Sequence, residues 1–130
     1  MTTQELCAAA RRMLAMAYVP YSHFPVGAAL ECMDGTVFTG CNIENAAYGP
    51  SNCAERTAVF KAVSEGYRYF RRIAIAADTE AFCAPCGVCR QVLHEFAPEL
   101  EVILVNRLGE TRTLTLPELF PYSFGGDILG

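Results

Sequence analysis

The sequence contains no tryptophan, few charged residues and no apolar run of membrane-spanning length. Charged residues make up 18% of its 130 residues, and 10 Lys and Arg residues are outnumbered by 14 Asp and Glu residues. A surface that binds polymeric nucleic acid needs clustered positive charge, so this acidic balance disfavours DNA or RNA as a partner. The shortness of the apolar runs likewise disfavours a membrane protein.

A secretory leader is not expected either, because Glu5, Arg11 and Arg12 interrupt the apolar segment that such a leader needs. The seven cysteines are an odd number, so they cannot all pair within one chain. In a reducing compartment, clustered cysteines more often bind metal or react than form disulfides. We therefore expect a cytoplasmic protein whose cysteines have a chemical role.

The apolar content indicates one folded domain that associates with other copies. A chain of 130 residues usually forms a single domain, which we expect to span residues 1–130. Hydrophobic residues make up 52% of the chain, which excludes a disordered protein. This fraction is also higher than a monomer of this size needs, and association into an oligomer would account for the surplus.

Helix and strand signals alternate along the chain. A capping box at residues 2–5 precedes a helical apolar pattern that ends at Pro20. Two β-prone runs, residues 26–33 and 36–43, meet at Asp34-Gly35, a dipeptide typical of tight hairpin turns. The remaining predicted elements are a helix over 53–65, a strand over 73–77, a helix over 86–96, strands over 102–105 and 112–114, and a short helix after the capping box of Thr115 and Glu118.

This order of elements predicts the fold class. The strand, helix and strand that cover residues 73–105 imply a parallel pair, whereas the earlier hairpin is antiparallel. We therefore predict an α/β protein, a three-layer α/β/α sandwich around a mixed sheet of about five strands.

A metal-binding pattern lies at the start of the third predicted helix. Cys86 and Cys89 are three residues apart in its first turn, so both sulfurs can bind one ion. A lone Cys-x-x-Cys motif is ambiguous, since redox, zinc and disulfide sites all use it. Cys53, at the start of the preceding helix, offers a third thiolate without a regularly spaced fourth ligand. Three protein ligands leave a coordination position open, as in catalytic zinc sites.

Such a site also needs groups that offset the negative charge of the thiolates and a group that accepts a proton from water. Three thiolates and a dication carry a net negative charge, which opposes the deprotonation of water at the site. The positive ends of two helix dipoles and hydrogen bonds from Arg56 and Arg90 to the sulfurs are expected to offset that charge. Glu55, beside the open position, can take a proton from water and pass it to a nitrogen of the substrate.

These motifs carry a resemblance to a known family. Cys53-Ala54-Glu55 together with residues 85–91, Pro-Cys-Gly-Val-Cys-Arg-Gln, resembles the zinc nucleoside deaminases. Residues 18–28, 40–46 and 53–58 extend the likeness to the small homotetrameric cytidine deaminases with three cysteines. The resemblance implies one zinc ion per chain and hydrolysis of cytidine and 2′-deoxycytidine to uridine and 2′-deoxyuridine, with release of ammonia, in pyrimidine salvage.

The resemblance also implies a role for individual residues. Cys53, Cys86 and Cys89 match the zinc ligands, Glu55 the proton shuttle, and Arg56 the arginine that hydrogen-bonds the ligand thiolates. The matching substrate-binding residues are Phe24 beside the pyrimidine, Asn42 and Glu44 at the ribose 3′-hydroxyl, Ala54, the loop residues Asn45, Ala46 and Tyr48 that reach a neighbouring subunit's site, and Phe124, which covers the base across an interface.

Two departures from the family pattern leave subunit contacts and fine substrate preference open. Ala84 stands where relatives often carry serine, and residues 48–52 fall in a stretch that varies among them. Neither departure removes a side chain assigned to catalysis.

Other interpretations of the same residues stay open at this point. The enzyme could deaminate another aminopyrimidine or an aminonucleoside antibiotic, since such enzymes share the metal motif. Cys86 and Cys89 could instead cycle as a dithiol in a redox or structural zinc module, and a nucleic-acid-binding module is a more distant alternative. The residues expected to have structural, solvent-facing or incidental roles are His23, His94, Cys7, Cys32, Cys41 and Cys83, of which Cys83 could compete as a metal ligand.

Overall fold

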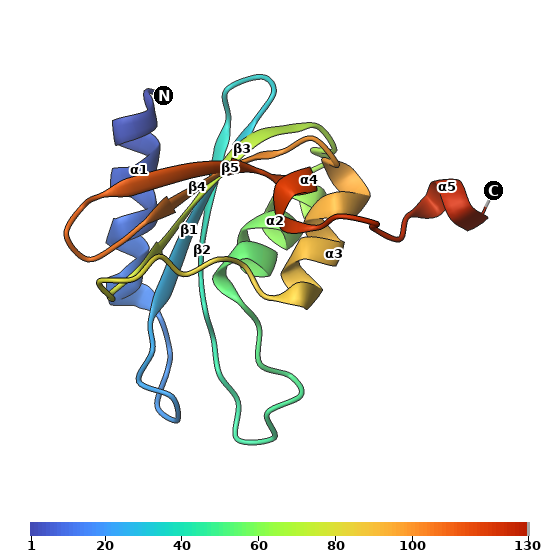
Figure 1. Ribbon diagram of the computed structural model, residues 1–130. Coiled ribbons are helices and arrows are strands. Elements are labelled where there is room, and N and C mark those ends of the chain that lie inside the picture. The colour runs from blue at the N-terminus through green and yellow to red at the C-terminus, as the bar shows by residue number, and fades with distance from the viewer. Residues whose placement is uncertain (130) are drawn as a thin grey trace.

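A mixed five-stranded sheet forms the centre of the computed structural model, which describes residues 1–129 (Figure 1). Residue 130, the last of the expected domain, lies outside the described residues. In spatial order the strands are β2 (Val37–Cys41), β1 (Val26–Cys32), β3 (Phe70–Ala77), β4 (Glu101–Val105) and β5 (Thr111–Thr115). Strands β3 and β4 are parallel, and the other neighbours are antiparallel, so the predicted mixed sheet is confirmed.

Helices cover both faces of this sheet (Figure 1). Successive strand side chains point to opposite faces, so Ala28 and Leu30 pack on one side while Ala29 packs on the other. Helix α1 (Thr3–Arg12) covers the face of Ala29, and α2 (Ala54–Ser64) and α3 (Gly87–Phe96) cover the opposite face. The predicted three-layer α/β/α sandwich is therefore confirmed.

The capping boxes predicted from the sequence form as expected. Thr2 and Glu5 exchange hydrogen bonds at the start of α1. Thr115 and Glu118 form a capping box for α4 (Leu116–Leu119). Each box satisfies amide groups that the first turn of a helix leaves without partners.

Three features of the chain were not predicted. A 3-10 helix, η1 (Met13–Met16), follows α1, and a short helix, α5 (Gly126–Leu129), lies near the C-terminus. Strand β3 starts at Phe70, three residues before the predicted start at residue 73. The prediction missed these residues because the charged side chain of Arg72 interrupts the apolar pattern. Arg72 nevertheless stays in the strand because its Nε donates to the buried carboxylate of Glu31, its partner on β1, at 2.8 Å.

The predicted hairpin between β1 and β2 turns at Asp34-Gly35. Of these two residues only Gly35 has a positive φ, of 93°. Asp34 instead accepts a hydrogen bond at 2.9 Å from the backbone N–H of Thr36. Glycine adopts this backbone conformation without steric cost, so the turn depends on Gly35.

Close contact between α2 and β2 fixes the position of the first turn of α2. A Cβ atom at Gly40 would lie 2.6 Å from the backbone nitrogen of Ala58 and still closer to the carbonyl oxygen of Ala54. Only glycine allows the helix to approach this near. The contact thereby fixes the start of α2, where Cys53 is the N-cap residue.

Within residues 1–129, we find no helix that combines the length and the apolar character needed to cross a membrane.

Candidate active site

Three cysteine sulfurs meet where two helices begin. Cys53 is the N-cap residue of α2, Cys86 is the N-cap residue of α3, and Cys89 lies in the first turn of α3. Their sulfur atoms all lie within 4.8 Å of one another, and the Sγ atoms of Cys53 and Cys86 are 3.7 Å apart. The predicted grouping of three thiols is therefore present in the folded chain.

The spacing of the sulfurs suits zinc. Zinc–sulfur bonds of about 2.3 Å at tetrahedral angles place two ligand sulfurs roughly 3.8 Å apart. The separation of 3.7 Å between Cys53 and Cys86 matches that value. Soft thiolate ligands in this arrangement favour zinc over the hard cations that prefer oxygen. Among the described residues, no fourth side chain joins the cluster, so a zinc ion held by these three sulfurs would keep one coordination position for water or substrate.

Two helix N-termini and two donor groups place positive charge beside the cluster. The positive end of each helix dipole lies beside Cys53 or Cys86, and the backbone N–H of Cys89 points to the Cys86 sulfur at 3.5 Å. Hydrogen bonds from Cys89 and from Arg56 lower the pKa of Cys53. Donation to Cys53, together with burial, raises the pKa of Cys89.

The two arginines expected to face the sulfurs differ in position. Arg56 donates from Nη2 to the Cys53 sulfur at 3.3 Å, as predicted. Arg90 does not: its Nε donates to the Pro85 carbonyl at 2.7 Å and its Nη1 to the Leu119 carbonyl at 2.5 Å. The prediction for Arg90 is wrong, because the side chain lies against the backbone around α3 rather than over the cluster.

Glu55 is the buried carboxyl group of this site. It lies in the first turn of α2, two residues after Cys53, and is only 4% exposed. Burial raises its pKa to about 7, and negative charge on Cys53 acts in the same direction. A carboxyl group with a pKa near neutrality can both hold and release a proton under ordinary conditions.

A cavity of about 440 Å³ opens beside the cluster. This volume suits a small organic molecule. The cavity wall includes the predicted residues Phe24, Asn42, Glu44, Cys53, Ala54, Glu55 and Cys86, and also Ser22, Val26, Ile75, Cys83 and Ala84. The fold therefore gathers one set of predicted substrate-binding residues around the thiols.

Asn42 and Glu44 hold the loop that carries Phe24. The side-chain amide of Asn42 accepts a hydrogen bond from the Val26 N–H at 2.9 Å and donates to the Phe24 carbonyl at 2.8 Å. Glu44 accepts from the backbone N–H groups of Tyr21 and Ser22 at 3.0 and 3.1 Å. Hydrogen bonds from Ser22 lower the pKa of Glu44, which keeps the carboxylate charged. These contacts with loop 21–26 could not be read from the motif.

The other predicted substrate residues do not line the cavity of their own chain. Asn45, Ala46 and Tyr48 lie in the loop that follows β2, and Phe124 lies in the segment between α4 and α5. Both segments project from the body of the fold (Figure 1). Tyr48 is 73% exposed and Phe124 is 50% exposed, so both side chains are available to another molecule.

Several cavity residues were not predicted as substrate contacts. The sequence indicated Ile75 only as part of a buried strand. It indicated Ser22 and Val26 only as neighbours of Phe24 in the motif. Cys83 lines the cavity but stays outside the three-sulfur cluster. A cavity wall combines distant segments, so sequence spacing alone gives little signal for such residues.

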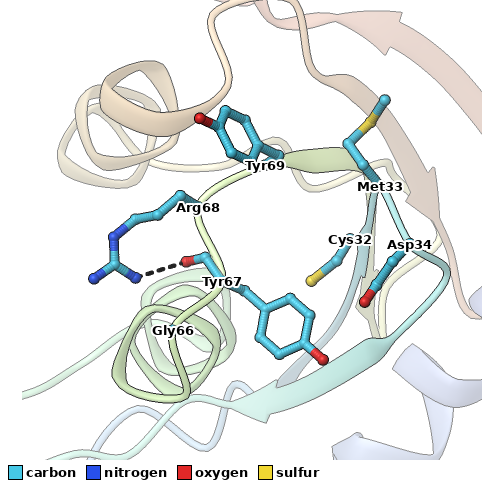
Figure 2. A pocket seen from close by; sticks show the side chains of 7 residues that line it. All are labelled: Cys32, Met33, Asp34, Gly66, Tyr67, Arg68 and Tyr69. Atoms are coloured by element: carbon cyan, nitrogen blue, oxygen red, sulfur yellow. Dashed lines mark hydrogen bonds between the residues drawn. The ribbon is translucent and has the colours of Figure 1, made fainter.

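A second pocket lies at the far end of β1 and is lined by Cys32, Met33, Asp34, Gly66, Tyr67, Arg68 and Tyr69 (Figure 2). Cys32 ends β1, whereas Val26 at the start of the same strand lines the cavity beside the thiols. The second pocket has a volume of about 230 Å³, below the usual range for small-molecule sites. The cavity beside the cysteines is therefore the candidate active site.

An α/β/α sandwich with an open three-thiolate metal site and a buried carboxyl group defines a zinc-dependent enzyme of the α/β class. Comparison with known proteins identifies the family. Residues 1–105 match the cytidine and deoxycytidylate deaminase zinc-binding region. The chain belongs to this family, and the predicted resemblance is confirmed.

Individual relatives resemble the chain over nearly its whole length. A cytidine deaminase from Sporosarcina psychrophila is 50% identical over 130 residues, which cover 99% of this chain and 96% of the relative. The crystal structure of a cytidine deaminase from Burkholderia pseudomallei superposes with a TM-score of 0.92 at 50% identity, over 95% of this chain and 100% of that chain. The cytidine deaminase from Mycobacterium tuberculosis gives a TM-score of 0.84 at 38% identity, over 96% of this chain and 98% of that chain.

Proposed function

We propose that this chain catalyses the hydrolytic deamination of cytidine and 2′-deoxycytidine, giving uridine or 2′-deoxyuridine and ammonia. The observation that carries the proposal is the position of Glu55. Its side chain is buried in the cavity wall, and it follows Cys53, a member of the three-thiol cluster, by two residues in the sequence. Cys53, Cys86 and Cys89 would hold one zinc ion per chain. Relatives named cytidine deaminase at 50% identity support the choice of substrate.

In this proposal, Glu55 moves the protons of the reaction. When bound, zinc supplies Lewis-acid activation of a water molecule. Glu55 would take one proton from the water and deliver it to N3 of cytosine, and would then take the remaining proton of the added hydroxyl group and deliver it to the amino group, which leaves as ammonia. The raised pKa of about 7 suits a group that must be ionised to accept a proton and protonated to donate one. Arg56 disperses the negative charge of the thiolates through its hydrogen bond to Cys53.

The cavity wall divides into a region for the base and a region for the sugar. Phe24 and Ala54 would bound the pyrimidine, because both line the cavity that Glu55 also lines. Asn42 and Glu44 would bind the ribose 3′-hydroxyl, and a carboxylate kept charged is a strong acceptor for a hydroxyl group. Their hydrogen bonds to loop 21–26 keep Phe24 in place beside them.

The remaining residues belong to a second chain's site in this proposal. We infer a cytoplasmic homotetramer that works in pyrimidine salvage. In this assembly Asn45, Ala46 and Tyr48 reach a neighbour's cavity, and Phe124 covers the base bound there. Support comes from the projection of both segments away from the body (Figure 1) and from the exposure of Tyr48 and Phe124.

A substrate panel tests the proposed function. Purified protein is incubated separately with cytidine, CMP, cytosine and adenosine, and absorbance change and ammonia release are followed. Cytidine should be converted to uridine, with one ammonia released for each molecule whose conversion the absorbance change reports. 2′-Deoxycytidine should react as well. Turnover of another aminopyrimidine with none of cytidine would contradict the proposal. About one zinc per chain, with activity blocked by a strong chelator, would exclude a dithiol mechanism.

A further inference from the structure

The C-terminal segment is held against the helix that carries two of the three clustered cysteines. Cys86 and Cys89 occupy the N-terminal end of α3. Farther along the same helix, the Nε2 amide group of Gln91 donates to the Phe124 carbonyl at 2.8 Å. His94, one turn later, lies 3.3 Å from the Ser123 hydroxyl through its Nε2 atom. One helix therefore contacts both the metal site and the segment that carries Phe124.

Packing around His94 adds to these polar contacts. Its ring meets the Phe120 ring edge-on, with centroids 5.8 Å apart and an interplanar angle of 87°. On the other side, a Cβ atom at Gly125 would lie 2.9 Å from His94 Nε2. The same Cβ atom would lie 2.8 Å from Asp127 Oδ1, so a side chain at residue 125 would displace His94 or Asp127. The half-buried His94 ring therefore contacts the segment between Phe120 and Gly125.

The backbone between these contacts adopts a costly conformation. Tyr122 has a φ of 53° although it carries a bulky side chain, and that side chain is fully exposed. A non-glycine residue keeps such a conformation only when its surroundings hold it there. The contacts of Phe120 and Ser123 with His94 flank Tyr122 and provide that restraint.

We propose that Gln91 and His94 are positioning residues that set the place of Phe124. The inference rests on the proposed function, in which Phe124 covers the base in a neighbour's cavity. Phe124 does not line the cavity of its own chain, and its ring is half exposed. The hydrogen bonds and ring contact of these two α3 side chains go to the Phe124 carbonyl, the Ser123 hydroxyl and the Phe120 ring, which leaves the Phe124 ring free to reach another chain. Neither residue touches substrate, so each acts through Phe124.

Variants of both positions test this inference. Gln91→Glu keeps the shape of the side chain but replaces its donor with a carboxylate that faces a carbonyl oxygen. His94→Ala removes the ring, and His94→Gln restores a polar group that can reach Ser123. Gly125→Ala places a methyl group against the His94 ring and the Asp127 carboxylate, which disturbs the contact between His94 and the segment while leaving α3 intact. Glu95→Gln is the matched control on the same helix, since among residues 1–129 Glu95 makes no side-chain hydrogen bond or salt bridge.

Two readouts decide the outcome. Hydrogen exchange of the Ile128 amide, which donates to the Gly125 carbonyl at 3.1 Å, should become at least about tenfold faster in Gln91→Glu, His94→Ala and Gly125→Ala, with the amides of β3 unchanged, because each variant loses restraint worth about one hydrogen bond. KM for cytidine should rise about tenfold in the same variants and in Phe124→Ala, with zinc content and kcat little altered. His94→Gln should recover part of both effects, and Glu95→Gln should alter neither.

Other results would overturn the inference. Unchanged exchange in Gln91→Glu and His94→Ala contradicts it even if the protein had no activity toward cytidine. A raised KM in Phe124→Ala without one in the α3 variants contradicts it while leaving the proposed function in place. Failure of the wild-type protein to deaminate cytidine would instead count against the proposed function, and the link from Gln91 and His94 to substrate binding would fall with it.

Discussion

The guanidinium group of Arg56 donates a hydrogen bond from Nη2 to the Sγ atom of Cys53 at 3.3 Å. Replacing Arg56 with glutamine removes the positive charge next to the thiolates. We expect weaker zinc retention, or a shifted pH optimum, with a smaller change in KM for cytidine, because Arg56 does not line the cavity. Zinc content after dialysis against a chelator, measured alongside KM, checks this prediction.

Arg71→Gln is the matched control for Arg56→Gln. Arg71 is exposed on β3 and lies outside the cavity wall, so its loss removes the same charge at a distance from the thiols. Zinc retention should match that of the wild-type protein. The assignment of Arg56 would be wrong if Arg56→Gln changed only KM.

Asn42→Ala should affect both the substrate and the loop that carries Phe24. The amide of Asn42 bonds the Val26 N–H and the Phe24 carbonyl, and both bonds disappear in alanine. We expect kcat/KM for cytidine to fall at least about tenfold, since even one lost hydrogen bond costs roughly 1 kcal/mol. Proteolysis within residues 21–26 should become faster. Intact cytidine turnover in this variant would contradict the proposed contact with ribose.

Acid should weaken the ion pair between Glu31 and Arg72. Burial acts to raise the pKa of Glu31, but hydrogen bonds and positive charge from Arg72 and from the N-terminal ammonium group outweigh it, so the pKa lies below its ordinary value of 4.5. A lowered pKa in the folded state stabilises the protein above pH 4.5, and this stabilisation is lost as the pH falls through the folded-state value.

Glu31→Gln tests that prediction. The variant should lose about 1 kcal/mol of stability at neutral pH, because Arg72 loses its carboxylate partner but keeps its hydrogen bonds to Thr3 and Met1. Denaturant unfolding at several pH values should show the difference from wild type shrinking as the pH falls below 4.5. A difference that stays constant across this range would contradict the prediction.

Gly40→Ala should destabilise the contact between β2 and α2. The added methyl group would meet the backbone of Ala54 and Ala58, which cannot move without shifting the helix. We expect a loss of about 2 kcal/mol in the free energy of unfolding. Gly126→Ala is the control, because a Cβ atom there meets open space. Equal midpoints of denaturation for the two variants would refute this account of the packing.

Much of the fold could be predicted because local signals agree with the final structure. The capping boxes at Thr2 and Thr115, the hairpin at Gly35 and the apolar run before Ala77 all lie where the chain forms the expected elements. Strand β3 was predicted too short, since Arg72 looks like a surface residue until Glu31 is placed beside it. The local pattern of apolar residues cannot indicate an ion pair between strands that are distant in the sequence, such as Glu31 on β1 and Arg72 on β3.

The candidate site was predictable only in part for the same reason. The grouping of Cys53, Cys86 and Cys89 followed from helix geometry and the motif, and the folded chain brings the sulfurs together. The target of Arg90 was predicted wrongly because its side chain bonds the carbonyls of Pro85 and Leu119, and position in sequence does not fix where a long side chain points.

The most direct test of the central claim is the turnover of Glu55→Gln, measured together with its zinc content. Glutamine keeps the size of the side chain but cannot carry the proton. The variant should retain about one zinc ion per chain and lose at least about a hundredfold in kcat for cytidine, the effect expected of a general acid–base group. Near-normal turnover with zinc still bound would contradict the assignment of Glu55 and the mechanism built on it.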